Sequence, residues 1–441
     1  MSAKARGGRA KAKKRSRPLP PEYNMLLTAT LCLLALGAVM VFSASSTTRI
    51  LQDGGLSDSA FYLKRTLLFG SVGLVIMYLA ARNGLRFVRE LTPLLLAGSI
   101  FLLLAVLVAG TEVNGATRWI GSGFLQVQPS ELVKVALILY GADLIANKPK
   151  RVRSLEGIMP FLLMVGGCCC LIMLQPDMGT TMVIVFSVGA MLVAAGMRPA
   201  DLGKIGLAIG VLALAMAVVE PYRMARLTSF LNPTADASGA GFQAAQAKIA
   251  LGSGGLLGEG LGNGVQKAFY LPEAHTDMIS AVIGEELGMA GITTVVFLFA
   301  MFGYAGLKTA QKAKDVYSKV LVTGLTSLVL VQAIINLFAV MGMAPLTGVP
   351  LPFVSYGNSS LMATLLAVGL ILNVARGGRA GAARASTPTR AGKLRVVEGG
   401  RSPARERSRA NGARKAKSGG GGGGNRGARR ARHGGRRRAS G

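Results

Sequence analysis

Long apolar segments constrain this chain more than any other feature of its sequence. Runs of about 17–25 mostly apolar residues recur along it, and each can cross the roughly 30 Å hydrocarbon core of a bilayer as a helix. Ten such segments are predicted, at residues 24–45, 66–82, 91–110, 132–146, 158–175, 179–196, 202–220, 278–307, 320–343 and 355–375. The sequence therefore predicts an all-α polytopic membrane protein of about ten transmembrane helices, with nine or eleven as alternatives.

The positive charge lies outside these segments. The formal net charge is +30, and the two ends of the chain account for 25 of these charges. The short connections near residues 82–89, 148–153, 198–204 and 308–319 are also basic and fall on the same side as both ends. Because Lys and Arg accumulate on the cytoplasmic side of membrane proteins, we expect both termini to be cytoplasmic. The segment 221–277 then forms a large extracytoplasmic loop between spans seven and eight.

Composition divides the chain into three regions. We predict a basic disordered cytoplasmic tail at 1–22, a transmembrane domain at 23–375, and an Arg/Gly-rich disordered cytoplasmic tail at 376–441. The first apolar run is expected to stay as an anchor, because it is too long for a typical cleaved signal peptide. The basic tails are expected to bind anionic membrane lipids, and no specific nucleic-acid binding is expected.

Histidine and cysteine are too sparse for the common metal sites. Only His275 and His433 are present, and the four Cys all lie in apolar runs, which argues against zinc ligand sets and a secreted disulfide framework. We therefore predict no metal-binding residues. A divalent cation such as Mg²⁺ or Mn²⁺ that accompanies a substrate is kept as an alternative.

Charged side chains on the outer side are candidate functional groups, because charge at a membrane edge is costly. Glu131 and Lys134 share one helix face, so they either pair with each other or leave Lys134 available to a phosphate. Asp177 precedes a predicted helix and is either a helix cap or part of a site. Glu285 and Glu286 are expected to pair with a Lys or Arg of another membrane span.

The outer segment 221–277 carries the largest set of candidates. Its cations Arg223, Arg226 and Lys267 favour an anionic substrate. The glycine-rich stretch 252–262 is either a hinge or turn, or a loop whose amides approach an anion. Asp277 lies where this segment meets an apolar helix, and partial burial there would suit its carboxylate to general-base catalysis, with a helix cap as the alternative.

Eight motifs, in this order along the chain, resemble the SEDS family (shape, elongation, division and sporulation). They lie at residues 114–120, 128–134, 176–180, 251–256, 266–267, 271–277, 284–288 and 350–357. The resemblance runs from about residue 24 to 375 and excludes the tails. Two positions depart from the family pattern, since Met278 stands where Phe is usual and Asn358 where Gly is usual.

The resemblance implies the SEDS fold and a glycosyltransferase of the bacterial cytoplasmic membrane. Such an enzyme polymerises lipid II into glycan strands on the outer face, working with a class B penicillin-binding protein. The resemblance implies that Asp277 is catalytic. Together with the charged outer residues, it gives a predicted substrate-binding set of Arg118, Glu131, Lys134, Arg223, Arg226, Lys267, Glu273 and His275.

Residues 40–46 and the run around Tyr270 resemble the division branch (FtsW-type) more than the elongation branch (RodA-type). This favours a place at the division septum, with other division proteins as partners. Two further functions stay open. A lipid II flippase or other transporter would also use charges at broken helices, although no internal repeat is visible. A non-catalytic scaffold that activates a separate synthase is the third possibility.

Overall fold

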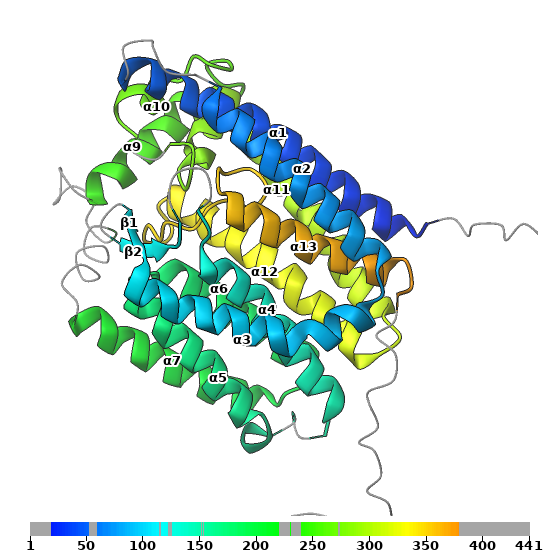
Figure 1. The fold of residues 1–441 in the computed structure, drawn as a ribbon. Helices are drawn as coiled ribbons and strands as arrows, with labels where there is room; N and C mark the ends of the chain where they lie inside the picture. The colour runs from blue at the N-terminus through cyan, green and yellow to red at the C-terminus, as the bar shows by residue number, and fades with distance from the viewer. Residues whose placement is uncertain are drawn as a thin grey trace, which may run out of the picture. The chain divides into compact units, whose positions relative to one another are not determined.

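Figure 1 shows the fold of the protein in a computed structural model. The structure describes residues 19–52, 60–113, 116–121, 126–150, 152, 154–219, 230, 240–271 and 274–378. The predicted tails lie outside the described residues, apart from 19–22 and 376–378. All described residues belong to the unit formed by positions 1–385.

Ten helices of the described part correspond one to one to the ten predicted segments. They are α1 (Pro21–Gln52), α2 (Phe61–Arg82), α3 (Leu85–Ala109), α4 (Pro129–Asn147), α5 (Leu155–Leu174), α6 (Met178–Ala194), α7 (Pro199–Val219), α11 (Ile279–Lys312), α12 (Val316–Val340) and α13 (Asn358–Ala375). In this part of the chain, seven helices are long and apolar enough to cross a membrane, namely α1, α2, α3, α5, α11, α12 and α13. The polytopic helical fold is thus confirmed, and the total of ten crossings stays a prediction.

The connections expected outside the membrane contain more structure than the sequence predicted. Strands β1 (Thr111–Val113) and β2 (Ala116–Trp119) form an antiparallel hairpin. Helices α9 (Ala240–Ser253) and α10 (Gln266–Phe269) lie within the segment expected to be one long loop. Figure 1 shows the hairpin and these helices at the same end of the helical body. Regular structure here satisfies backbone groups close to the membrane surface.

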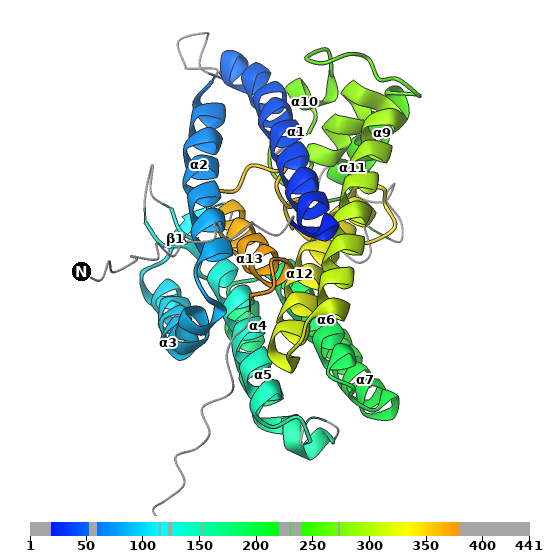
Figure 2. The ribbon, with the colours of Figure 1, turned by 90° about the vertical axis from the view of Figure 1, so that its right-hand side faces the viewer.

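Helix α12 lies at the centre of the bundle, between α13 and α6 in both Figure 1 and Figure 2. Helix α2 packs along α13, and small residues let the two backbones approach closely. A Cβ added at Gly369 would lie only 2.5 Å from the carbonyl oxygen of Met77. One turn further along α13, Asn373 donates a hydrogen bond of 2.9 Å to the carbonyl of Ala80. This packing fixes α13, and with it the connection that leads into α13.

Helix α11 is broken at Gly288, where φ is 64° and ψ is −160°. The glycine-rich stretch docks onto this break. The amides of Glu259 and Gly260 donate to the carbonyls of Glu285 and Glu286 at 3.0 and 3.1 Å. Both amides are therefore already hydrogen-bonded within the fold and cannot bind an anion. Of the two predicted alternatives, the stretch is a turn, docked onto α11.

Replacing Gly288 with Ala is expected to destabilise the protein by roughly 1–3 kcal/mol, because a Cβ at positive φ is strained. It would also lie 2.4 Å from the amide nitrogen of Gly258. Gly98→Ala is the matched control, since Gly98 lies inside α3 and nothing lies within 4 Å of its added Cβ. Thermal melting of the purified variants checks this, and equal melting temperatures for the two would contradict the docked turn.

Candidate active site

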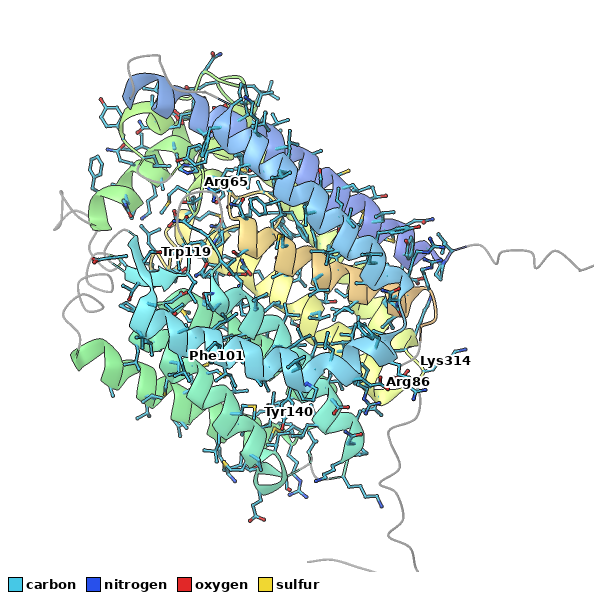
Figure 3. The ribbon with its side chains drawn as sticks, in the orientation of Figure 1. Arg65, Arg86, Phe101, Trp119, Tyr140 and Lys314 are labelled. Atoms are coloured by element: carbon cyan, nitrogen blue, oxygen red, sulfur yellow. The ribbon has the colours of Figure 1, made fainter. Side chains whose placement is uncertain are left out.

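Polar residues gather at one end of the bundle around the α12–α13 connection, residues 341–357. Figure 3 shows Arg65 and Trp119 near this end and Arg86 and Lys314 near the opposite one. The first turns of α4, α6, α11 and α13 and the last turns of α12 meet there. By the positive-inside argument this is the expected outer end.

Asp277 lies in the turn just before α11 and is partly buried. Met278, not Asp277, occupies the N-cap position, and α11 has no side-chain cap, so the helix-cap alternative for Asp277 is wrong. The carboxylate accepts a hydrogen bond of 3.1 Å from the Thr276 hydroxyl. A Cβ built at Gly348 would lie 3.9 Å from Oδ2 of Asp277, so the carboxylate faces the α12–α13 connection.

Asn336, buried in α12, fixes the backbone of Asp277. Its side-chain amide donates to the carbonyl of Asp277 at 2.7 Å and to the carbonyl of Val349 at 2.8 Å. Its side-chain oxygen accepts from the hydroxyl of Ser280 at 2.7 Å. One side chain therefore joins the first turn of α11 to the α12–α13 connection.

Gln332 lies one turn before Asn336 on α12 and makes the corresponding link to α4. Its amide donates to the carbonyl of Pro350 at 3.2 Å, and its oxygen accepts from Nζ of Lys134 at 3.2 Å. Lys134 also pairs with Glu131 at 2.8 Å, and both side chains are only 3% exposed. Pairing of Glu131 with Lys134, one of the two predicted alternatives, is therefore what this structure contains.

Arg118, on β2, binds the end of α5. Its guanidinium donates to the carbonyl of Gln175 at 2.9 Å and also to the carbonyl of Pro176. The next residue, Asp177, is the N-cap of α6 and accepts from the amide of Thr180 at 3.0 Å. The predicted cap role of Asp177 is confirmed, and Arg118 holds the turn that leads into it.

Lys267, on α10, is buried in an ion pair with Glu286 of α11, with 1% of its side chain exposed. Its ammonium also donates to the hydroxyl of Ser43 at 3.0 Å and to the carbonyl of Gly262 at 2.9 Å. Glu286 does pair with a basic residue as predicted, but that residue comes from the outer segment 221–277 and not from another membrane span. Glu285 instead accepts two backbone amides, at 2.7 and 2.9 Å, where α10 begins.

His275 belongs to an aromatic cluster next to Asp277. Its ring centroid lies 4.5 Å from that of Tyr62 and 5.5 Å from that of Tyr356. Its carbonyl accepts from the amide of Tyr356 at 2.9 Å. Burial raises the pKa of Tyr356, and the positive charge of the buried Arg65 opposes that shift.

Three predicted substrate-binding residues, Arg223, Arg226 and Glu273, lie outside the described residues. Of the six described site residues, Arg118 holds the turn between α5 and α6, and the other five form two groups. Asp277, His275, Lys134 and Glu131 are joined through α12 and the α12–α13 connection, whereas Lys267 pairs with Glu286 between α10 and α11. Within the described ranges, no three His, Cys, Asp or Glu side chains are grouped so that they could hold a metal ion.

Sequence reasoning missed Gln332, Asn336 and Arg65. The first two carry no charge, and the search for functional groups followed charged residues. A usable signal was present, because they are the two amide side chains of α12 and stand four residues apart, on one face. Arg65 is a buried cation near the start of α2 and could have been noticed by the rule that membrane charges are functional by default.

Comparison with sequence families matches residues 23–380 to the FtsW/RodA/SpoVE family, described as cell cycle proteins. The chain belongs to this family. The matched range contains the predicted transmembrane domain, so the SEDS resemblance is confirmed.

Relatives and solved structures agree with this assignment. The chain is 41% identical to stage V sporulation protein E of Bacillus subtilis, covering 80% of this chain and 96% of that protein. It is 39% identical to the probable peptidoglycan glycosyltransferase FtsW of Trichlorobacter lovleyi, covering 81% and 94%.

Two solved structures share this fold. One is described as structural coordination of polymerization and crosslinking by a peptidoglycan synthase complex, with a TM-score of 0.64, 27% identity and coverage of 80% and 97%. The other is the rod shape determining protein RodA of Thermus thermophilus, with a TM-score of 0.59, 28% identity and coverage of 80% and 96%. The chain is thus a multi-pass membrane protein that shares the architecture of these two solved structures.

Proposed function

We propose that this protein is a peptidoglycan glycosyltransferase that polymerises lipid II into glycan strands on the outer face of the cytoplasmic membrane. Its FtsW relatives are named probable peptidoglycan glycosyltransferases. The observation that carries the proposal is the placement of Asp277. Its carboxylate faces the α12–α13 connection at the expected outer end, and its backbone is anchored by Asn336.

In the proposed reaction, Asp277 accepts the proton of the acceptor sugar hydroxyl. The resulting oxygen attacks the anomeric carbon of the donor sugar, the glycosidic bond forms, and the bond to the lipid pyrophosphate breaks. The pyrophosphate leaves with the electron pair, and Asp277 returns its proton to water. A rigidly held base needs little reorganisation during the reaction, which is the benefit of the Asn336 anchor.

Positive charge is needed where the pyrophosphate leaves. We propose Arg118, Lys134, Lys267, Arg223 and Arg226 for this role, with Glu131, Glu273 and His275 as further substrate contacts. Lys134 and Lys267 are each bonded to a carboxylate, so direct contact with the pyrophosphate requires those pairs to open. A divalent cation brought in with the pyrophosphate would add to this charge.

The proposed partner is a class B penicillin-binding protein, in keeping with the fold shared with a peptidoglycan synthase complex. We propose septal synthesis during cell division, with other division proteins nearby, since several relatives are FtsW proteins. Roles in sporulation or in cell elongation are the alternatives, because the chain is also similar to a sporulation protein and to RodA. Both termini are proposed to be cytoplasmic, with disordered basic tails that bind anionic lipids.

Polymerisation of lipid II by the purified full chain, with and without its cognate class B penicillin-binding protein, tests this proposal. Glycan strands should form when the chain is present and be absent with the partner alone. If no pairing produces strands and the chain instead moves lipid II across vesicle membranes, the protein is a flippase and the proposal is wrong.

Replacing Asn336 with Leu is expected to lower the turnover rate about 100-fold, since misplacing a catalytic group by about 1 Å can cost that much. Asn373→Leu is the matched control. Asn373 is also a buried amide that donates to backbone carbonyls, but it lies at the far end of α13. Both variants should melt at lower temperature, and only Asn336→Leu should lose turnover per folded molecule. Equal losses would mean that Asn336 is merely structural.

A further inference from the structure

A cavity of about 210 Å³ lies at the opposite end of the bundle from Asp277, where α1 begins and α11 and α13 end. Figure 3 shows Lys314, one of its lining residues, at the same end of the bundle as Arg86. The cavity is larger than the roughly 150 Å³ of an engineered cavity that holds benzene. It therefore has room for a small headgroup, but no proposed step of glycan synthesis uses it.

Charges of both signs line this cavity. Glu22 pairs with Lys312 through one carboxylate oxygen, and Lys314 is the other ionisable residue of the lining. The Glu22 side chain is only 8% exposed. Its second oxygen, Oε2, is buried and has no hydrogen-bond partner among the described residues. A buried carboxylate oxygen without a donor is costly, so a ligand that enters the cavity and turns a donor toward Glu22 would relieve this cost.

The surface next to the cavity is suited to a lipid. Tyr304, Lys308 and Lys312 follow one another at four-residue intervals and so share one face of α11. Tyr304 is 57% exposed, and the Lys308 ammonium lies 5.7 Å from its ring centroid. An exposed tyrosine followed by lysines is typical of a helix crossing from hydrocarbon into the headgroup region. The aromatic ring of Tyr304 and the methylene chains of Lys308 and Lys312 can lie along the acyl chain of a lipid.

We propose that this cavity binds the headgroup of an aminophospholipid, the phosphatidylethanolamine class. Its primary ammonium donates to Oε2 of Glu22, and its phosphate lies between Lys312 and Lys314. A primary ammonium has three donors, whereas a choline headgroup has none and a glycerol headgroup lacks the positive charge. The cavity thus distinguishes headgroups by their amine rather than by net negative charge. This inference is independent of the proposed glycosyltransferase activity.

Native mass spectrometry of the detergent-purified full chain tests the proposal. It measures the binding of phosphatidylethanolamine, phosphatidylcholine and phosphatidylglycerol with matched acyl chains. The wild-type protein should retain phosphatidylethanolamine at least about tenfold more tightly than phosphatidylcholine, as expected for a charge-assisted hydrogen bond. This comparison needs no variant. Equal retention of the two lipids would overturn the proposal, because the ammonium would then add nothing to binding.

Glu22→Gln should abolish the preference for the amine lipid. Glu90→Gln is the matched control, because Glu90 also pairs with a basic residue, Arg86, but its side chain is 56% exposed. The control should keep the preference. If phosphatidylglycerol binds more tightly than phosphatidylethanolamine and Glu22→Gln changes neither, the site is simply basic and the proposal is wrong.

Discussion

Replacing Asp277 with Asn is expected to reduce lipid II polymerisation by a factor of about 10²–10⁴, the usual contribution of a general base. Asn keeps the size of the side chain but cannot accept the proton. The fold should survive, because the Asn336 anchor is bonded to the backbone carbonyl of residue 277 rather than to the carboxylate. The measurement is glycan strand formation by the purified variant in complex with its class B penicillin-binding protein.

Glu112→Gln is the control for this experiment. Glu112 is an exposed carboxylate on β1, at the same end of the bundle, so its loss changes the outer charge equally without touching the site. It should polymerise at the wild-type rate. An Asp277→Asn variant that also polymerises normally would remove Asp277 from the chemistry. If only complex formation failed, Asp277 would contribute to partner binding instead.

Replacing Lys134 with Met is expected to destabilise the protein by about 3–5 kcal/mol, because it leaves the Glu131 charge buried without its partner. Glu131 is only 3% exposed, so water cannot take the place of the lost ammonium. The double variant Glu131→Gln, Lys134→Met should recover most of this stability, since no uncompensated charge stays buried. Unfolding of the single and double variants in detergent, compared by a double-mutant cycle, measures the coupling.

The double variant also separates the two roles considered for Lys134. If it is stable but polymerises lipid II far more slowly than wild type, Lys134 acts on the substrate as well as on Glu131. If it is both stable and active, the pair serves the fold alone. A single variant as stable as wild type would contradict the buried pair itself.

Much of the fold could be predicted from the sequence because a bilayer leaves few choices. Backbone groups in hydrocarbon must bond within their own segment, so each long apolar run becomes a helix. All ten runs did so. Local spacing also predicted the contact between Glu131 and Lys134, since residues three apart on a helix are neighbours wherever the helix lies. The same holds for Asp177, whose capping contact spans three residues.

Only the tertiary structure decided the contacts between residues that are far apart in the chain. Asn336 reaches Asp277 across 59 positions, and Ser43 reaches Glu286 across 243. The break of α11 at Gly288 depends on the glycine-rich stretch that docks there. Periodicity encodes only neighbours along one helix. Which helices lie side by side depends on close packing of small residues and on pairing of buried polar groups. The sequence by itself therefore determined the helices, the short-range contacts and the family, and only the packing of distant helices assembled the site around Asp277.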